Sequence, residues 1–352
     1  MQSVVDHPLG LSAQWLSEAL HAAGHPFTVS DVRFERVGTG QMGTTYRLDL
    51  SYEGVEGPPT LIAKLAGEDE GMRSMVAPGY AAEVGFYSRL APGLNIRTPR
   101  CWYGAITNDH TRFTLLLDDM FPATPGIQAD GCTVEQAAAS LRTLVGLHIQ
   151  WLDDPKLRDM EFLMRADKDT AAMMAQVMSQ ACEAFMERYA DDLAPEDGET
   201  MRRACSVIER WQLAEASPFS VIHGDYRLDN LLFDPATGEA TAVDWQTAAI
   251  GPPLRDVAYF LGTSMRSEDR AAHEESLVRT YHTALLQNGL STYSFDHCWN
   301  DYRIGQLQGP MIAVIGCIYA GSKRTKKSDA MFIAMVRRSC AAVRDLGSLD
   351  LV

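Results

Sequence analysis

The chain has 352 residues, of which 46% are hydrophobic, and this share excludes wholesale disorder. Its formal net charge of −15 makes it a poor candidate for binding nucleic acid or an anionic membrane through bulk charge. Seven cysteines without a C-x-x-C pair argue against a zinc site, a redox pair and a secreted disulfide framework. The sequence shows no signal peptide and no apolar run long enough to span a bilayer, so we expect a cytoplasmic protein with reduced thiols.

The N-terminal third of the sequence is predicted to be mostly β-structure. The expected elements are, in chain order, a helix over 12–23, strands over 45–50 and 61–65, a helix over 81–90 and a strand over 113–117. A loop with Pro122, Pro125 and Gly126 follows, and it is the best candidate for a boundary between two lobes. Beyond it, apolar residues recur at helical spacing after a capping box at Thr133 and Gln136. We therefore expect a β-rich part, a short link and a larger helical part.

The most informative segment carries three oxygen-bearing side chains between short apolar strands. Asp225 precedes Asn230 by five residues, and Asp244 ends an apolar strand fourteen residues further on. Phosphoryl transfer needs a carboxylate that accepts the proton of the attacking hydroxyl, and it needs oxygen ligands for Mg²⁺. Asp225 can serve as that base, and Asn230 and Asp244 can hold the metal. Each residue alone is common in polar turns, so the prediction depends on all three at this spacing.

A glycine-rich segment lies earlier in the chain. Gly38, Gly40 and Gly43, with Gln41 and Met42 between the last two, form a G-x-G-x-x-G pattern. A dinucleotide site with this pattern requires a following helix and an acidic residue about 20 positions further on. Here a strand pattern follows instead, and the residue at that distance is an alanine. A strand, a glycine loop and a second strand are typical of the flap that covers nucleotide phosphates in kinases, and an ordinary hairpin turn is the alternative.

A lysine in an apolar strand and a glutamate in the next helix form the third signal. Lys64 follows the glycines at the distance where a strand lysine would bind nucleotide phosphates. A half-buried ammonium group needs a counter-charge, and Glu83 is the natural partner. The alternatives are a lysine at the edge of the sheet that extends into solvent, and a solvated glutamate.

Together these motifs resemble the aminoglycoside phosphotransferase and choline kinase superfamily, including its ecdysteroid-kinase-like branch. The resemblance lies in residues 223–225, Asn230, 243–246 and 251–261, and it extends from 34 to 261. Its third motif reads Asp-Trp-Gln where protein kinases have Asp-Phe-Gly, which fits the small-molecule branch.

The resemblance implies an α+β, two-lobed, protein-kinase-like fold with ATP bound between the lobes. It implies a nucleotide-binding lobe at 1–118, which includes the helix at 12–23, and a helical lobe at 119–352. The helical lobe would contain a catalytic loop at 223–230 and a metal-binding segment at 244–246. In that scheme Asp225 is the catalytic base, Asn230 and Asp244 hold magnesium, Lys64 paired with Glu83 anchors the phosphates, and His223 and Asp256 support the loop. The backbone at 115–118, which includes Leu117, would contact the adenine.

Only twelve residues separate Asp244 from Asp256 and no Ala-Pro-Glu follows, which leaves little room for the activation segment of a protein kinase. We therefore expect ATP- and Mg²⁺-dependent transfer of a γ-phosphoryl group to a hydroxyl of a small molecule. The acceptor could resemble an aminoglycoside, choline or an apolar alcohol. A nucleotide-binding pseudokinase that regulates a partner, and a protein kinase, are the alternatives. The acceptor, the choice between ATP and GTP and the oligomeric state stay open at this stage.

Three further features have simpler explanations. His148 lies on the apolar face of its helix and is expected to be a hydrogen-bonded core histidine. The methionines within 173–186 recur near helical spacing and are expected to pack in a core, with an apolar substrate pocket as the alternative. The basic run 323–327 is expected to be a solvated face, and Gln246 has no assigned role.

Overall fold

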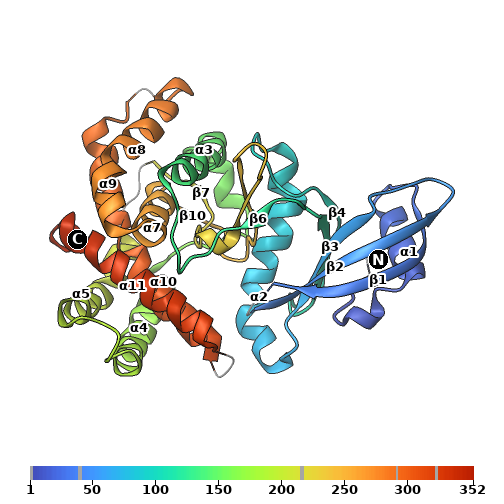
Figure 1. The fold of residues 1–352 in the computed structure, drawn as a ribbon, viewed down its shortest axis with the longest axis horizontal. Helices are drawn as coiled ribbons and strands as arrows, with labels where there is room; N and C mark the ends of the chain where they lie inside the picture. Colours follow the sequence, from blue (N-terminus) through green and yellow to red (C-terminus); the bar gives the residue numbers. More distant parts are fainter. Residues whose placement is uncertain (1–2, 39–41, 215–217, 291, 322–323) are drawn as a thin grey trace.

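The computed structural model describes residues 3–38, 42–214, 218–290, 292–321 and 324–352. A sheet-bearing part and a larger helical part lie side by side, with the two chain ends at opposite sides of the molecule (Figure 1). The sheet is antiparallel and has the order β1 (Thr28–Val37), β2 (Gly43–Glu53), β3 (Thr60–Ala66), β5 (Phe113–Asp118) and β4 (Cys101–Ile106). We call this part the sheet lobe and the remainder the helical lobe.

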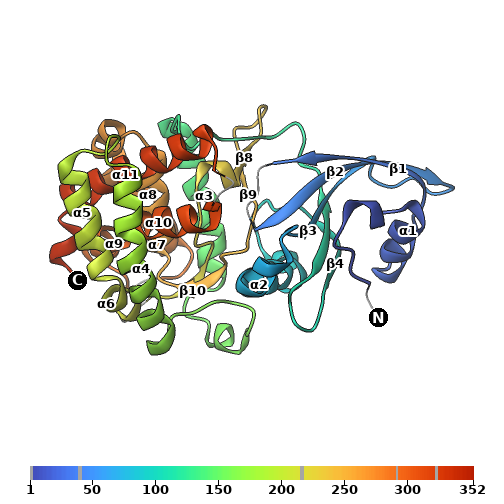
Figure 2. The same ribbon diagram turned by 90° about the horizontal axis from the view of Figure 1, so that it is seen from below.

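Different helices cover the two faces of the sheet because side chains alternate along the strands. The helices are α1 (Ala13–Ala22), as predicted over 12–23, and α2 (Glu70–Gly85). Leu61 and Leu65 of β3 pack into the core that α1 shares. Ala66 packs in the core on the α2 side, and Lys64 shares its face of the strand. Figure 2 shows α1 on the outer side of the sheet and α2 toward the helical lobe.

Helix α2 begins earlier than the sequence predicted. The prediction started at residue 81, whereas the helix starts at Glu70, where the Asp69 side chain caps it by accepting a main-chain hydrogen bond. Pro78 and Gly79 lie in its interior and hid this start, because both residue types disfavour helices. A π-helical turn at Phe86–Leu90 continues it. The extra turns bring a longer helix surface, including Gly79, against the helical lobe.

The helical lobe combines long helices with two small sheets. Its helices are α3 (Val134–Gln150), α4 (Lys168–Arg188), α5 (Pro195–Ser206), α6 (Ile208–Leu213), α7 (Leu254–Ser264), α8 (Ser267–Gln287), α9 (Phe295–Gly305), α10 (Gln308–Ala320) and α11 (Lys326–Asp345). One sheet has the order β6 (Thr124–Pro125), β8 (Leu231–Phe233) and β9 (Ala240–Ala242), and the other pairs β7 (Ser220–Ile222) with β10 (Ala249–Gly251). The small sheets carry the segment that contains Asp225 and Asp244.

One hydrophobic core runs from the α2 face of the sheet into the helical lobe. At its centre Phe86 stacks on Trp245 with ring centroids 3.6 Å apart and planes 8° from parallel. A second core lies among α4, α5, α10 and α11. The expected α+β arrangement of a β-rich lobe and a helical lobe is therefore confirmed. Within the described ranges, no helix combines the length and the apolar character that crossing a membrane requires.

Candidate active site

The segment 223–230 forms a loop between β7 and β8, and helix α7 holds its backbone in place. The Asp256 carboxylate accepts hydrogen bonds from the main-chain nitrogens of His223 (2.6 Å) and Gly224 (2.9 Å). Gly224 has φ of +82°, and a Cβ there would lie 2.5 Å from the carbonyl oxygen of Thr247. Only glycine fits such a position, so the loop path depends on this residue.

His223 is oriented by hydrogen bonds at both ring nitrogens. Its Nε2 lies 3.1 Å from the carbonyl oxygen of Val243, and its Nδ1 lies 3.3 Å from the main-chain nitrogen of Asp225. The carbonyl requires a donor and the main-chain N–H requires an acceptor, so the ring carries its proton on Nε2. Both ring nitrogens are therefore engaged in holding the loop.

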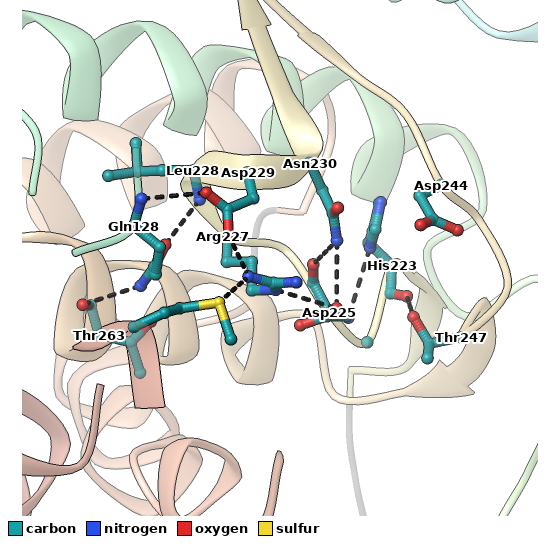
Figure 3. A network of polar contacts seen from close by, with 12 residues as sticks. Gln128, His223, Asp225, Arg227, Leu228, Asp229, Asn230, Asp244, Thr247 and Thr263 are labelled. Carbon is teal, nitrogen blue, oxygen red and sulfur yellow. Dashed lines mark hydrogen bonds and ion pairs between the residues drawn. The ribbon is translucent and has the colours of Figure 1, made fainter. Parts of the chain in front are cut away.

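The Asp225 carboxylate accepts three side-chain hydrogen bonds (Figure 3 shows two of the three donor residues). Oδ1 accepts from the Tyr259 hydroxyl at 2.7 Å. Oδ2 accepts from Arg227 Nε at 3.2 Å and from Asn230 Nδ2 at 3.1 Å. The side chain remains 22% exposed, so a ligand can still reach it. This arrangement fixes the direction in which the carboxylate points.

Strand pairing places Asn230 opposite Val243, the residue before Asp244. Leu231 pairs with Ala242 in the β8–β9 ladder, and the next hydrogen bond joins Val243 N to the carbonyl oxygen of Asn230 at 2.9 Å. The following residue, Asp244, has φ of +66°, which is rare outside glycine and turns the chain away from the strand. In the view of Figure 3 both side chains lie on the same side of the loop, with the ring of His223 drawn between them.

The donor set of these two residues fits magnesium. Asn230 Nδ2 is used on the side chain and carbonyl oxygen of Asp225, so the amide oxygen stays available as a ligand. Among the described residues no cluster of three or more His, Cys, Asp or Glu side chains could hold a metal. Mg²⁺ needs no such cage, because it commonly binds one or two protein oxygens together with water and substrate phosphates.

Lys64 lies between two carboxylates that come from different parts of the chain. Its Nζ pairs with Glu83 Oε1, and it lies 3.2 Å from Asp244 Oδ1. Burial alone would lower the pKa of Lys64, but Asp244 and Glu83 outweigh it and hold the pKa above its ordinary value. Burial would raise the pKa of Asp244, but Lys64 keeps it below its ordinary value. A charged lysine and an ionised aspartate therefore face each other at this point.

Glu83 itself is fully buried on α2. Burial raises its pKa, and Lys64 only partly offsets this effect. Its Oε2 has no hydrogen-bond partner among the described residues. The carboxylate is therefore held through Oε1, which pairs with Lys64 as predicted and accepts a hydrogen bond from the main-chain nitrogen of Trp245 at 3.3 Å.

The glycine segment joins two strands, as predicted. β1 ends at Val37 and β2 begins at Gly43, so a strand follows the glycines where a dinucleotide fingerprint would need a helix. Gly38 has φ of +75°, and the carbonyl oxygen of Met42 accepts a hydrogen bond from the Tyr80 hydroxyl. The predicted residues Gly40 and Gln41 lie outside the described residues.

Leu117 lies in β5, where it pairs with Ile62, two residues along β3 from Lys64. Since side chains alternate along a strand, Leu117 and Lys64 share one face of the sheet. The side chain of Leu117 is buried in the core that joins the two lobes. This places Leu117 near the predicted phosphate anchor.

Three residues near the site escaped the sequence analysis. Tyr259 follows Asp256 by three positions on α7, a spacing that puts both on one helix face and could have revealed it. Arg227 joins Asp225 to Asp229 at 3.2 Å and 2.5 Å. Gln308 donates to the carbonyl oxygen of Gly224 at 2.7 Å, and no local pattern pointed to it.

Gln246, which had no assigned role, is buried against β2 and α2. If Gly43 carried a Cβ, that atom would lie 3.3 Å from Gln246 Nε2. A Cβ on Gly79 would lie 3.0 Å from the carbonyl oxygen of Gln246. It also contacts Glu83, whose pKa it helps to lower, although burial dominates that pKa. Gln246 therefore packs the segment 244–246 against the start of β2 and against α2.

We next compare His148, the methionines within 173–186 and the basic run 323–327 with their predictions. His148 is fully buried, with Nδ1 at 2.7 Å from the Tyr281 hydroxyl and Nε2 at 3.3 Å from Asp256. Met178 and Met186 pack in the second core, whereas Met173 is 59% exposed. Part of the basic run, residue 323, lies outside the described residues.

Comparisons with known proteins agree with the motifs. Residues 139–292 match the sequence model of the ecdysteroid kinase-like family. A choline kinase from Cryptosporidium parvum superposes with a TM-score of 0.56 at 13% identity, over 92% of each chain. An aminoglycoside 2′-phosphotransferase solved with GDP gives 0.52 at 11% identity, over 93% of this chain and 98% of that one. An ethanolamine kinase from Plasmodium vivax superposes with a TM-score of 0.50 at 9% identity, over 90% of this chain and 83% of that one.

A short segment also matches a much longer protein. Acyl-CoA dehydrogenase family member 10 of Mus musculus is 51% identical over 41 residues, which are 11% of this chain and 4% of that relative. The chain thus matches only a small fraction of the length of this curated relative. Together, the family match and the structural neighbours confirm the resemblance to the aminoglycoside phosphotransferase and choline kinase superfamily and its kinase-like fold.

Proposed function

We propose that the protein transfers the γ-phosphoryl group of ATP, with magnesium, to a hydroxyl group of a small molecule. The observation that carries this proposal is the meeting of Lys64, Glu83 and Asp244, which come from three separate stretches of the chain. Asp225 and Asn230 lie on the adjoining loop. An amine, a metal-binding pair and a carboxylate base are the groups that phosphoryl transfer requires.

Lys64 would bind the nucleotide phosphates, and Glu83 would hold its ammonium group in place. In the described structure the lysine is already oriented by its two carboxylates, so binding would cost little side-chain entropy. Asp225 would accept the proton of the attacking hydroxyl. His223 and Asp256 would keep the loop in the conformation that presents Asp225.

Asn230 Oδ1 and the Asp244 carboxylate would hold the magnesium ion. When bound, the metal would neutralise charge on the nucleotide phosphates. The segment from Gly38 through Gly40, Gln41 and Met42 to Gly43 would cover the phosphates with its backbone.

The nucleotide would bind between a lobe of residues 1–118 and a lobe of residues 119–352. The backbone at 115–118, which includes Leu117, would contact the adenine, and the Leu117 side chain lies on the same face of the sheet as Lys64. Neighbours of this fold have been solved with GDP, so GTP is a donor to test beside ATP. We also propose a cytoplasmic location, because all seven cysteines are free thiols in the structure.

The acceptor is proposed to be a small alcohol, since the neighbours of this fold include choline, ethanolamine and aminoglycoside kinases. The test incubates the protein with Mg²⁺ and either ATP or GTP, in the presence of choline, ethanolamine, kanamycin or ecdysone. Mass spectrometry then looks for one added phosphoryl group. Nucleotide binding without a phosphorylated product from any acceptor, and without hydrolysis, would instead identify a pseudokinase.

Replacing Asp225 by asparagine tests the proposed base. Asparagine keeps the shape of the side chain but cannot accept the proton, so we expect turnover to fall about 10²- to 10⁴-fold. Nucleotide affinity, measured by calorimetry, should stay close to that of the parent protein. A variant that turns over at the parent rate would remove Asp225 from the mechanism.

A further inference from the structure

The two carboxylate oxygens of Asp225 accept different numbers of hydrogen bonds. A carboxylate has about four lone-pair sites, two on each oxygen. Oδ2 accepts from Arg227 and Asn230, so both of its sites are used. Oδ1 accepts only from Tyr259, at 2.7 Å. The described hydrogen bonds therefore occupy three of the four lone-pair sites, and the site that they leave open lies on Oδ1.

Helix α7 controls both the loop and this carboxylate. Asp256 binds the main-chain nitrogens of His223 and Gly224, and Tyr259, three residues later, reaches Asp225 Oδ1. Residues three apart lie on the same side of a helix, so one rigid helix face fixes the backbone and the side chain together. Both Asp256 and Tyr259 are fully buried.

Tyr259 can only donate to this oxygen. Its burial raises its pKa well above the ordinary value, and the nearby Asp225 charge adds to this effect. The phenol therefore remains protonated at neutral pH and takes no proton from an acceptor. Its hydroxyl occupies one lone pair of Oδ1 and fixes the direction of the other.

We propose that Tyr259 is a positioning residue that directs the open lone pair of Asp225 Oδ1 toward the acceptor hydroxyl. The inference rests on the proposed function. In the transfer step the acceptor O–H bond breaks and its proton moves to Oδ1. The acceptor oxygen bonds to the γ-phosphorus, and the bond from that phosphorus to the bridging oxygen breaks, leaving its electron pair on the nucleoside diphosphate.

The test compares two variants that each lose one buried phenol-to-carboxylate hydrogen bond. Tyr259→Phe removes the contact with Asp225, and Tyr302→Phe removes a contact of the same length, 2.7 Å, with Glu274. Both tyrosines are fully buried, so both variants should lose similar stability in thermal unfolding. A purely structural role for Tyr259 would make the two variants behave alike in catalysis.

Turnover is measured with the best acceptor from the panel above and as ATP hydrolysis, in which water takes the acceptor's place. We expect Tyr259→Phe to lower kcat about 10- to 100-fold, because a misdirected base loses alignment with the hydroxyl. The KM values for nucleotide and acceptor should stay within about twofold of the parent, since the tyrosine touches neither. Tyr302→Phe should keep the parent kcat. An unchanged kcat in Tyr259→Phe would overturn the proposal.

Crystal structures of the parent and Tyr259→Phe provide a readout that does not depend on activity. We expect the Asp225 carboxylate to rotate or to occupy two orientations in the variant. If the carboxylate keeps the parent orientation, the positioning role is refuted whatever the enzyme does. If the parent neither phosphorylates an acceptor nor hydrolyses ATP, the proposed function fails, while the two structures still decide the role of Tyr259.

Discussion

At the scale of single residues, the site depends on how buried charges are compensated. Lys64 is 9% exposed and pairs with Glu83, which is fully buried, and with Asp244. A buried ion pair contributes little net stability, but removing one partner leaves an uncompensated charge that costs several kcal/mol. The pair is thus better explained by its position beside Asp244 than by stability.

Replacing Lys64 by methionine should destabilise the protein by about 3 kcal/mol, because Glu83 loses its only described ion-pair partner. Urea denaturation measures this loss. Arg202→Met is the matched control, since Arg202 pairs with Glu183 on the surface with both side chains at least half exposed. That variant should change stability by no more than about 0.5 kcal/mol.

The loss in Lys64→Met should also depend on pH. The pKa of Glu83 is raised by burial, and without Lys64 it would rise further. The folded variant then binds more protons than the unfolded chain, so its stability falls as pH rises and recovers as pH falls. The deficit relative to the parent should therefore be smaller at acidic pH. A deficit that grows on acidification would contradict this account.

At the scale of elements, α2 and the segment after β9 pack closely enough to set each other's position. Phe86 stacks on Trp245, and Gly79 approaches the carbonyl oxygen of Gln246. Glu83 lies between these two contacts on the same helix. The distance from Lys64 and Glu83 to Asp244 is thus determined by helix packing, which no motif in the sequence describes.

Replacing Gly79 by alanine tests this packing. In an exposed helix the change would stabilise by about 1 kcal/mol. Here the new Cβ would lie 3.0 Å from the Gln246 carbonyl oxygen, so we expect no stabilisation and a weaker affinity for a non-hydrolysable ATP analogue, measured by calorimetry. Ser74→Ala, at an exposed position of the same helix, should leave the affinity unchanged. Equal affinities in both variants would show that α2 can shift freely.

At the scale of the whole molecule, the sequence motifs identified residues that lie together in the structure, such as Lys64 and Asp244, whereas the start of helix α2 was predicted wrongly. Asp225, Asn230 and Asp244 were selected by their residue types and by their spacing between short apolar strands, and the hydrogen bond from Val243 N to the carbonyl oxygen of Asn230 shows how two of these segments pair. The pairing of Lys64 with Glu83 followed from the cost of a buried charge. The start of α2 was wrong because Pro78 outweighed the pattern around it.

The contacts that orient Asp225 were not predicted, and the three-residue spacing of Asp256 and Tyr259 on α7 was the one sequence signal that pointed to any of them. Arg227 is near in sequence, but Tyr259 reaches Asp225 across 34 residues. Such a contact depends on the angle at which α7 packs under the loop, and that angle results from the shared core of both lobes. Sequence patterns report local structure and charge, whereas this orientation arises from tertiary packing.

We propose that Lys64, Asn230 and Asp244 together receive a magnesium–nucleotide complex. The most direct test of this proposal is calorimetric titration of the parent and of Asp244→Ala with a non-hydrolysable ATP analogue, with and without Mg²⁺. We expect Mg²⁺ to strengthen binding to the parent, and Asp244→Ala to abolish this dependence because one of the two proposed ligands is lost. A parent affinity that ignores Mg²⁺, or a variant that keeps the full magnesium effect, would contradict it.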